Sequence, residues 1–519
     1  LFATNFVESV LNQLWADAAH YAATLFLPFC LALLLLLFAR QVLLPTRRVG
    51  RWTGWALPPI LLGALFLPTQ HRHQQASTPD TLYLHAMGGM LRTQLGLSKE
   101  SHQLRPRLRD SLPVASTSAQ LPAGVARRNV VFVILESVRK DATCNEYAPS
   151  CRKTEATNQL FPDRYPLNQL RALDSSTAIS LAVLWSGVGP HEDRDTLHEW
   201  PLVFDYAKAA GYQTSYWTSQ NMMFGNVRLW VKNLGVDSFF SATDVEPDAD
   251  IDLGAHEGAF ARRALKAIPE LKEPFFLTIQ LSNGHYPYLV DPSGPQPFQP
   301  SEMSKAPEDN DKFFNYYQNA VYQEDQHLAQ VLSAIQQSDF GERTVIVYTS
   351  DHGEAFREHG QMGHTFSVFD EEVLVPAWID APSGTLSAEE VAALESKKEA
   401  FTFHPDLTVT LLDLLGVWDQ ASLNPYRSKI LGQSLLRPEP NRRALPMTNC
   451  AGVWSCAFEN WGFMQGSMKL EARAWDSEYQ CFDVLKDPKE EHNLGAESCG
   501  GLFAQAEELF LRLPGTKED

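Results

Sequence analysis

From residue 129 onward, short apolar runs alternate with segments in which apolar residues recur at helical spacing. Each run is typical of a strand buried on both faces, as in a parallel sheet covered by helices. The predicted strands are residues 130–135, 213–217, 275–280, 344–348 and 373–379. The predicted helices are residues 205–210, 314–337 and 407–415. This alternation predicts an α/β fold with a doubly wound, mostly parallel sheet flanked by helices.

Two longer apolar runs lie near the start of the chain, which begins at Leu1 as a processed or truncated protein would. Residues 21–44 carry a single charge, Arg40, and are long enough to span a bilayer. Residues 52–68 contain two adjacent prolines and fit either a second span or a buried or interfacial helix. The loop between the runs holds three arginines, so the positive-inside rule places it in the cytoplasm and the rest of the chain outside.

The cysteines agree with this topology. One of the seven lies in the first apolar run, and the other six follow the two runs as close neighbours. Six cysteines allow 15 pairings, but the clustering favours three local disulfides in an oxidising compartment. The expected pairs are Cys144 with Cys151, Cys450 with Cys456, and Cys481 with Cys499.

Composition divides the chain into three regions. Residues 1–70 are the predicted transmembrane region, and the polar, proline-punctuated residues 71–125 are a predicted connector near the membrane. Residues 126–519 form the predicted catalytic domain, with a smaller subdomain at about 438–519 that is rich in aromatic residues and cysteine. The net charge of −19 argues against a nucleic-acid-binding surface and is compatible with an enzyme that holds cations.

Polar residues follow two of the predicted strands. Asp351 and His352, with Gly353 behind them, come after strand 344–348, and Glu136 comes directly after strand 130–135. Open α/β sheets bind ligands at the carboxyl ends of their strands. An isolated Asp-His pair is equally compatible with a polar turn, and an isolated glutamate with a helix cap.

A third polar segment, residues 174–180, is rich in small and hydroxyl residues and leads into an apolar helix. A hydroxyl at a helix N-terminus lies in the positive end of the helix dipole, which favours its ionised form and any bound phosphate. Together, Glu136, a threonine of this segment, Asp351 and His352 would supply three oxygens and one nitrogen to a divalent cation. A threonine at such a site would be an activated nucleophile.

These elements resemble the alkaline phosphatase superfamily in its sulfatase-like branch, over about residues 128–500. Within that branch they are most similar to the membrane-bound phosphoethanolamine transferases and the lipoteichoic acid synthases. The resemblance implies that Glu136, Thr177, Asp351 and His352 bind one divalent metal ion, zinc or manganese, and that Thr177 is the nucleophile.

The resemblance also points to two histidines. His285 follows the strand at 275–280, and His364 lies twelve residues after His352. Both would bind the phosphoryl group or a second zinc ion and would take part in catalysis. His359 is a competitor for His364, since only five positions separate them.

The chain departs from two members of this branch. True sulfatases follow their nucleophile with proline and arginine at fixed offsets, and residues 179–181 supply neither, which disfavours sulfate ester hydrolysis. Phosphoethanolamine transferases flank the nucleophile with a disulfide, whereas residues 173–183 contain no cysteine. A lipoteichoic-acid-synthase-like or unassigned branch therefore stays open.

The expected function is that of a monomeric enzyme in the bacterial cytoplasmic (inner) membrane, with its catalytic domain on the periplasmic or extracellular side. It would move a phosphoethanolamine or phosphoglycerol head group from a membrane phospholipid through a phospho-threonine to an envelope glycan or lipid. One alternative is a phosphate or sulfate ester hydrolase with the same site. Another is a non-catalytic membrane lipid sensor on this fold.

Overall fold

The computed structural model describes residues 109–515, apart from 223–230, 232, 439–442, 450–458, 475, 477 and 512. The chain divides into two compact units, residues 1–107 and 108–519, of which the described residues belong to the second. The predicted spans at 21–44 and 52–68 lie outside the described residues. Among the helices that are described, none combines the length and the apolar character needed to cross a bilayer.

A seven-stranded sheet lies at the centre of the described unit, in the order β2-β10-β7-β1-β6-β4-β5. Strands β7, β1, β6, β4 and β5 run parallel, whereas β10 runs antiparallel to both of its neighbours. The mixed α/β architecture with a mostly parallel sheet is therefore confirmed. The strands are β1 (Asn129–Leu135), β2 (Tyr165–Pro166), β4 (Gln213–Thr218), β5 (Ser238–Phe240), β6 (Phe275–Leu281), β7 (Thr344–Ser350) and β10 (Ala377–Asp380).

One predicted strand is wrong in extent. Residues 373–379 do not form a single strand, because α14 (Asp370–Val373) occupies the start of this segment and β10 begins only at Ala377. Pro376 lies between them. Proline has no N–H to donate to a sheet ladder, so it is found in edge strands, as Pro166 is in β2, or before the start of a strand with neighbours on both sides, as Pro376 is before β10.

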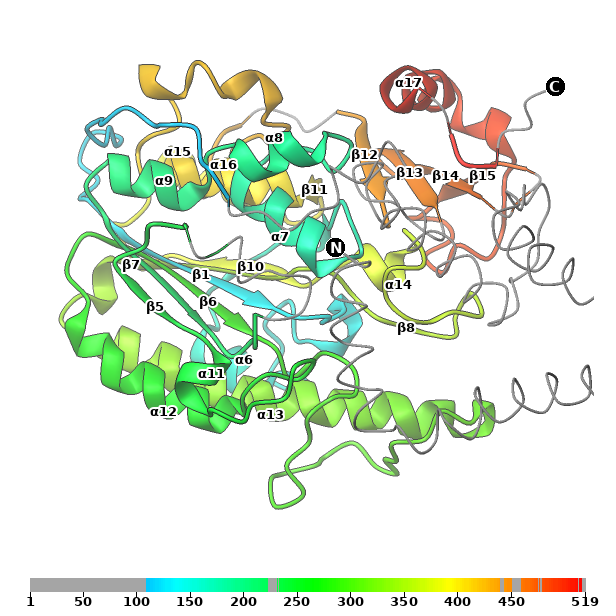
Figure 1. The fold of residues 1–519 in the computed structure, drawn as a ribbon, viewed down its shortest axis with the longest axis horizontal. Coiled ribbons are helices and arrows are strands. Elements are labelled where there is room, and N and C mark those ends of the chain that lie inside the picture. Colours follow the sequence, from blue (N-terminus) through cyan, green and yellow to red (C-terminus); the bar gives the residue numbers. More distant parts are fainter. Residues whose placement is uncertain are drawn as a thin grey trace, which may run out of the picture. The chain divides into compact units, whose positions relative to one another are not determined.

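Two layers of helices enclose the sheet (Figure 1). Side chains of β1 alternate between them: Val130, Phe132 and Ile134 join one hydrophobic cluster, and the intervening residues join the other. On one face lie α7 (Thr177–Ser186), α8 (Arg194–Glu199), α9 (Val203–Ala209), α15 (Ala388–Glu395) and α16 (His404–Leu414). On the other lie α6 (Glu155–Leu160), α11 (Ala242–Val245), α12 (Glu257–Ala267) and α13 (Asn310–Gln336).

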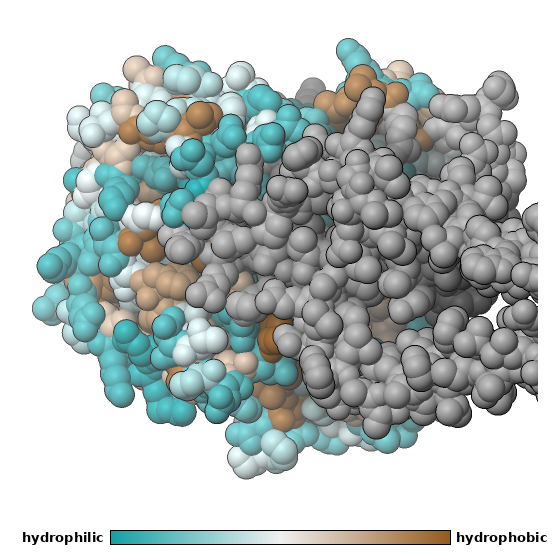
Figure 2. Space-filling view, in the orientation of Figure 1, coloured by the Kyte–Doolittle hydropathy of each residue, from teal (hydrophilic) through white to brown (hydrophobic). Residues whose placement is uncertain are grey.

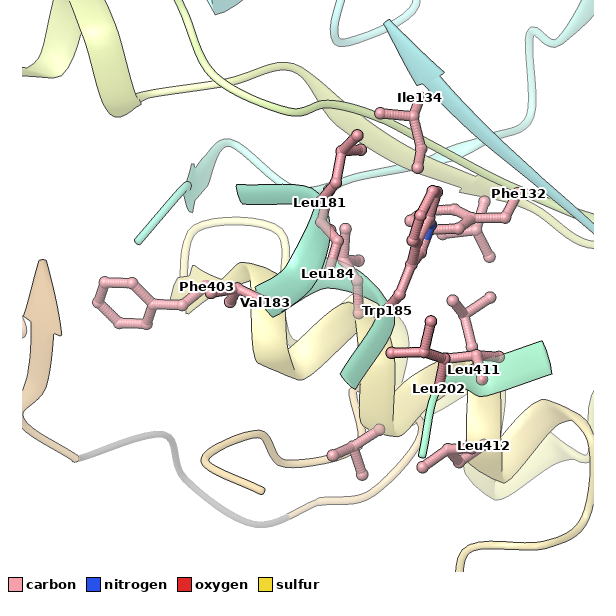
Figure 3. Packing of buried hydrophobic residues seen from close by; sticks show 14 of the residues in the cluster. Phe132, Ile134, Leu181, Val183, Leu184, Trp185, Leu202, Phe403, Leu411 and Leu412 are labelled. Atoms are coloured by element: carbon pink, nitrogen blue, oxygen red, sulfur yellow. The ribbon is translucent and has the colours of Figure 1, made fainter. Parts of the chain in front are cut away.

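Helix α7 is anchored along most of its length. Nine of its ten residues are buried, and Figure 3 shows Trp185 beside Phe132 of β1 and Leu184 directed toward α16. The helix ends at Gly187, whose φ of +72° is a left-handed conformation suited to glycine. A Cβ at that position would also lie 2.9 Å from Ile430 Cγ2. The first residue of α7 is therefore held by a rigid core.

The segment after residue 438 forms a second, antiparallel sheet of β12 (Leu445–Thr448), β13 (Asn460–Gln465), β14 (Met468–Arg473) and β15 (Gln480–Asp483). Helix α17 (Gly501–Phe510) packs on it, with the Phe510 ring stacked 5.0 Å from that of Trp461. Buried Lys469 of β14 ties this sheet to α14, the short helix before β10, through a 2.8 Å ion pair with Asp370. Two smaller sheets pair β3 (Gln169–Arg171) with β11 (Phe401–Phe403) and β8 (Ala355–Phe356) with β9 (Met362–Gly363).

The described end of the predicted connector packs against the same unit. The N–H of Leu112 donates to the carbonyl of Glu199 at 2.7 Å, and that of Gln120 donates to the carbonyl of Gly416 at 2.8 Å. Residues 109–125 contain no regular helix or strand. This part of the connector is therefore an extended strap on the catalytic unit.

On the face drawn in Figure 2, the coloured surface is mostly hydrophilic, and hydrophobic side chains form scattered patches. Single exposed apolar residues are normal for a folded protein. The large hydrophobic residues exposed over the described unit as a whole are Leu112, Tyr147, Phe239, Ile251, Leu265, Met303, Leu485, Leu494, Leu509 and Leu511.

Two of the three predicted disulfides are confirmed. Cys144 bonds to Cys151 and Cys481 bonds to Cys499. The third predicted pair, Cys450 with Cys456, lies outside the described residues.

The Cys481–Cys499 bond closes a loop of 18 residues around the C-terminal sheet. We expect its replacement by two serines to lower the free energy of unfolding by about 3 kcal/mol, because the cross-link restricts the unfolded chain. Urea unfolding, followed by circular dichroism, measures this change. The Cys144–Cys151 double variant is the comparison, since its loop of 7 residues predicts a smaller loss of about 2 kcal/mol. A larger loss from the shorter loop would contradict the explanation by loop length.

Candidate active site

The parallel register of the central strands brings the predicted metal ligands to one edge of the sheet. Leu135, the last residue of β1, pairs with Ser350, the last residue of β7. Glu136 and Asp351 therefore leave their strands side by side, with His352 next along the chain. The N–H of Asp351 donates to the carbonyl of Leu135 at 3.0 Å, which continues the contact past the strand ends.

Thr177 reaches the same edge from helix α7. Its Oγ1 donates to Glu136 Oε1 at 2.7 Å and lies 3.1 Å from His352 Nε2. As the first residue of α7, Thr177 is at the positive end of the helix dipole, where an ionised oxygen is stabilised. The structure thus brings together all four residues of the predicted metal set.

The nearby hydroxyls face elsewhere. Ser175 Oγ donates to the carbonyl of Ser367 at 2.8 Å, and Ser180 Oγ donates to the carbonyl of Asp351. Among these three hydroxyl groups, that of Thr177 is the one beside Glu136 and His352.

The carboxylates and the imidazole form a set of donors suited to a divalent cation. Glu136, Asp351 and His352 each offer one ligand atom, and the three atoms lie within 4.8 Å of one another. Asp351 Oδ1 accepts from the N–H groups of Ser137 and His352, but its Oδ2 is buried and makes no hydrogen bond within the described part of the chain. A cation would satisfy this oxygen and relieve the repulsion between the carboxylates.

The protonation of these groups follows from burial. Burial, together with the charge of Asp351, raises the pKa of Glu136 to about 7, and burial raises the pKa of Asp351 to about 7. Burial and the neighbouring His364 lower the pKa of His352 to about 4. Its Nδ1–H donates to the carbonyl of Gly353 at 2.9 Å, which leaves Nε2 with a free lone pair toward the carboxylates. A neutral imidazole in this tautomer is the form that binds metal.

The two predicted histidines lie beside this set. The His364 ring is 4.4 Å from that of His352 and 5.1 Å from that of His285, measured between centroids. His364 Nδ1 is 2.9 Å from Glu354 Oε2, which fixes the orientation of the ring. Burial lowers the pKa of both His285 and His364, the latter to about 4.

His359, the competitor of His364, lies apart from these rings. Its Nδ1 is 2.6 Å from Glu371 Oε1, its Nε2 faces the carbonyl of Glu490, and its ring stacks on Phe369. Burial lowers its pKa, but Glu371 and the carbonyl of Glu490 more than compensate, so the pKa rises from 6.5 to about 9. His359, in the turn between β8 and β9, is therefore a structural cation that links α14 to the C-terminal segment.

This raised pKa predicts a pH dependence of stability. Because the folded value exceeds the unfolded value, the contribution of His359 is complete below about pH 6.5 and is lost as the pH rises through about 9. We expect the wild type to lose about 1 to 2 kcal/mol more than His359→Gln across this interval, after allowing for solvent screening. Urea unfolding of both proteins at pH 6 and pH 9.5 measures the difference. An equal change in the free energy of unfolding of the two proteins between these pH values would contradict the raised pKa of His359.

Two residues at the site were not predicted from the sequence. Glu354 is fully buried and accepts from Tyr288 Oη at 3.1 Å as well as contacting His364, while burial raises its pKa to about 7. Gln220 donates its side-chain amide to Glu136 Oε2. A signal for each existed, because both follow strand ends: Gln220 comes two residues after β4, and Glu354 two residues after His352.

A family model described as Sulfatase matches residues 128–417, which is more than half of the chain. The chain belongs to the sulfatase family. The matched segment contains Glu136, Thr177, His285, the Asp351-His352 pair and His364.

Three relatives indicate the range of this family. The "Lipoteichoic acid synthase-like YvgJ" of Bacillus subtilis is 22% identical over 258 residues, which cover 48% of this chain and 40% of that protein. Arylsulfatase K of Gallus gallus is 30% identical over 121 residues, which cover 23% of this chain and 20% of that protein. The chain thus spans less than half the length of either curated relative.

The third relative is a solved structure of a protein in the alkaline phosphatase superfamily from Vibrio parahaemolyticus. It superposes with a TM-score of 0.53 at 16% identity, covering 80% of this chain and 95% of that one. At this identity the likeness shows the fold. It confirms the predicted superfamily fold for this sulfatase-family chain.

Proposed function

We propose that this chain is a metal-dependent phosphotransferase that moves a phospholipid head group through a phospho-threonine at residue 177. The observation that carries the proposal is the position of Thr177 Oγ1, 2.7 Å from Glu136 Oε1 and 3.1 Å from His352 Nε2 at the N-terminus of α7. A hydroxyl in this place is poised for nucleophilic attack. The proposed chemistry is also consistent with the lipoteichoic acid synthase relative.

The donor set fits one divalent cation, zinc or manganese. Glu136, Asp351, His352 and Thr177 would hold it, because the unpartnered Asp351 Oδ2 and the lone pair of His352 Nε2 belong to the same cluster. When bound, such a cation favours the ionised form of a neighbouring hydroxyl and neutralises charge on a phosphoryl group. A second zinc ion beside His285 and His364 stays a prediction.

In the first step, Thr177 Oγ1 forms a bond to the phosphorus of a phospholipid phosphodiester, and the bond from phosphorus to the diacylglycerol oxygen breaks. Thr177 Oγ1 loses one proton in this step, and the leaving oxygen of diacylglycerol gains one. In the second step, a hydroxyl of an envelope glycan or lipid attacks the phosphorus, the bond to Thr177 breaks, and the threonine regains a proton. His285 and His364, on the same side of the site, would orient phosphoryl oxygens and transfer protons.

The membrane setting is part of the proposal. The predicted spans, the arginine-rich loop between them and the disulfides would place the catalytic unit on the outer side of a bacterial cytoplasmic membrane, as an integral membrane protein and a monomer. Both the lipid donor and the enzyme would then be confined to one surface, which favours their encounter.

Mass spectrometry of the peptide containing Thr177 tests this function. After incubation of the purified chain with Mn²⁺ or Zn²⁺ and either phosphatidylethanolamine or phosphatidylglycerol vesicles, we expect a phosphoethanolamine or phosphoglycerol adduct on Thr177. The mass identifies the transferred group. Release of diacylglycerol without any adduct on the protein would contradict a phospho-threonine intermediate.

A phosphate or sulfate ester hydrolase is the second candidate, favoured by membership in the sulfatase family and the arylsulfatase K relative. Its chemistry differs only in that water accepts the group from Thr177. Comparison of turnover with and without an added glycan or lipid acceptor separates the two, since a hydrolase is indifferent to the acceptor. A non-catalytic lipid sensor would show neither adduct nor turnover.

A further inference from the structure

The turn that carries His285 is held by two buried carboxyl groups. The N–H groups of Ser282 and Asn283 donate to Glu257 Oε1 at 2.9 and 3.1 Å. The next N–H, that of Gly284, donates to Glu324 Oε2 at 3.0 Å. Three consecutive amides before His285 therefore have a carboxyl group as their partner.

These carboxyl groups come from α12 and α13, two helices on the same face of the sheet. Glu257 is the first residue of α12 and is 3% exposed, and Glu324 lies within α13 and is 2% exposed. The turn between them has no room to move toward the metal set. A Cβ at Gly284 would lie 2.6 Å from the carbonyl oxygen of Glu136 and 3.6 Å from Glu324 Oε2.

The two groups differ in how many donors they face. Glu257 Oε1 also accepts from Ser219 Oγ at 2.8 Å, so among the described residues it faces three donors, whereas Glu324 faces one. Donors stabilise a carboxylate, so Glu257 is the better place for a negative charge. Each residue has one further buried oxygen, Glu257 Oε2 and Glu324 Oε1, without a hydrogen-bond partner in the described part of the chain.

Burial, and to a smaller extent the surrounding charges, opposes ionisation of both groups. Burial and the charge of Glu257 raise the pKa of Glu324 well above its usual range, and Asp325 and Glu136 act in the same direction. Burial raises the pKa of Glu257 to about 7, against its three donors, and Glu246 adds to the rise. Two adjacent buried carboxyl groups do not both ionise readily.

We propose that Glu257 and Glu324 are positioning residues for His285, with Glu257 acting as a carboxylate and Glu324 as a neutral acid. This inference rests on the proposed function for the role of His285. The clamp itself, meaning the hydrogen bonds from the N–H groups of residues 282–284 to the two carboxyl groups, does not depend on that function. In this state Glu324 accepts the N–H of Gly284 without repelling Glu257, and the turn stays closed against the carbonyl of Glu136. An ionised Glu324 would repel Glu257 and loosen the turn.

The two protonation states predict that a glutamine preserves the turn at residue 324 but loosens it at residue 257. Glutamine resembles a neutral carboxylic acid, with an oxygen to accept the N–H of Gly284 and an amide in place of the O–H. Glu324→Gln should therefore preserve the turn, and Glu324→Ala should not. Glu257→Gln exchanges a carboxylate with three donors for a weaker neutral acceptor, so it should loosen the turn more than Glu324→Gln.

The first experiment measures steady-state turnover of the full chain on phosphatidylglycerol vesicles with Mn²⁺. We expect kcat of Glu324→Gln within about 3-fold of wild type and kcat of Glu324→Ala lower by about 10- to 100-fold, as for a misplaced catalytic group, with KM changed less than kcat. The kcat of Glu257→Gln should lie between the values of these two variants. Asp325→Asn is the matched control, because this neighbouring buried residue of α13 accepts from Ala156 and Thr157 instead of the turn.

The second experiment measures hydrogen exchange of the amides at residues 282–285, which requires no activity. Exchange should be faster than wild type in Glu324→Ala and Glu257→Gln and unchanged in Glu324→Gln and Asp325→Asn. Equal exchange in Glu324→Gln and Glu324→Ala overturns the neutral-acid assignment. If Glu324→Ala does not fold, the two glutamine variants decide, and equal or reversed exchange between them overturns the proposal. Inactive protein with the expected exchange pattern would remove the proposed function and leave the clamp in place.

Discussion

Replacing Thr177 with alanine is expected to lower the rate of head-group transfer by at least about 10³-fold, because the covalent step then has no nucleophile. The loss should appear in kcat, since the Glu136, Asp351 and His352 cluster and the two neighbouring histidines stay in place. Diacylglycerol release from labelled lipid vesicles measures the rate. The peptide containing residue 177 should carry no adduct in this variant.

Thr177→Ser is the matched control, because it keeps the hydroxyl at the N-terminus of α7 and removes only a methyl group. We expect it to retain transfer within about 100-fold of wild type and to form the adduct on the serine. The hydroxyls of Ser175 and Ser180 should not substitute for Thr177, since each already donates to a backbone carbonyl. Turnover of Thr177→Ala within 10-fold of wild type would show that the nucleophile lies elsewhere.

Replacing Asp351 with asparagine is expected to abolish stabilisation by divalent metal. A cation that binds the folded chain alone raises its stability by about 4 kcal/mol at a thousand times its dissociation constant. Asp351→Asn removes the charge that the unpartnered Oδ2 offers and should reduce this gain to near zero. Thermal unfolding in EDTA, Mn²⁺ and Zn²⁺, with metal content measured on the same samples, gives the result.

The metal-free variant should be at least as stable as the metal-free wild type, because one of two buried carboxylates near each other has gone. Glu372→Gln is the control: Glu372 is also fully buried, and burial raises its pKa to about 8, but it accepts hydrogen bonds from Ser367 and lies outside the metal cluster. It should keep the full metal shift. An undiminished shift in Asp351→Asn would contradict the proposed ligand set.

The pattern of apolar runs predicted the central strands and the edge of the sheet at which the candidate site lies. Runs such as 130–135 and 344–348 are apolar on both faces, which is typical of a strand inside a helix-covered sheet, so the polar residues after them were expected at a sheet edge. Residues 373–379 are apolar as well, but Pro376 interrupts the ladder and the observed strand starts after it. A pattern of hydrophobicity does not include hydrogen-bonding capacity, which is why the extent of this strand was wrong.

The choice between His359 and His364 shows where sequence reasoning stopped. Both histidines follow Asp351 within thirteen residues, His359 between β8 and β9 and His364 directly after β9, and it was the resemblance to a known family that favoured His364. The fold separates them, because His359 contacts Glu371 of α14 and the carbonyl of Glu490, the latter 131 residues away, while His364 contacts Glu354 beside the metal set. The path of the folded chain, and not the spacing of the histidines, decides such assignments.

The Asp351-His352 pair and Glu136 could therefore be placed at a sheet edge from the sequence alone, because each follows a strand whose pattern is local, whereas Thr177 was chosen from the resemblance to a known family. The tertiary structure alone decided that Leu135 pairs with Ser350 and that Thr177 Oγ1 lies 2.7 Å from Glu136. It alone revealed Glu354, Gln220 and the carboxyl groups of Glu257 and Glu324 around the site. Strand register and helix packing are long-range properties of the folded chain, and they bring together polar groups that no local pattern connects.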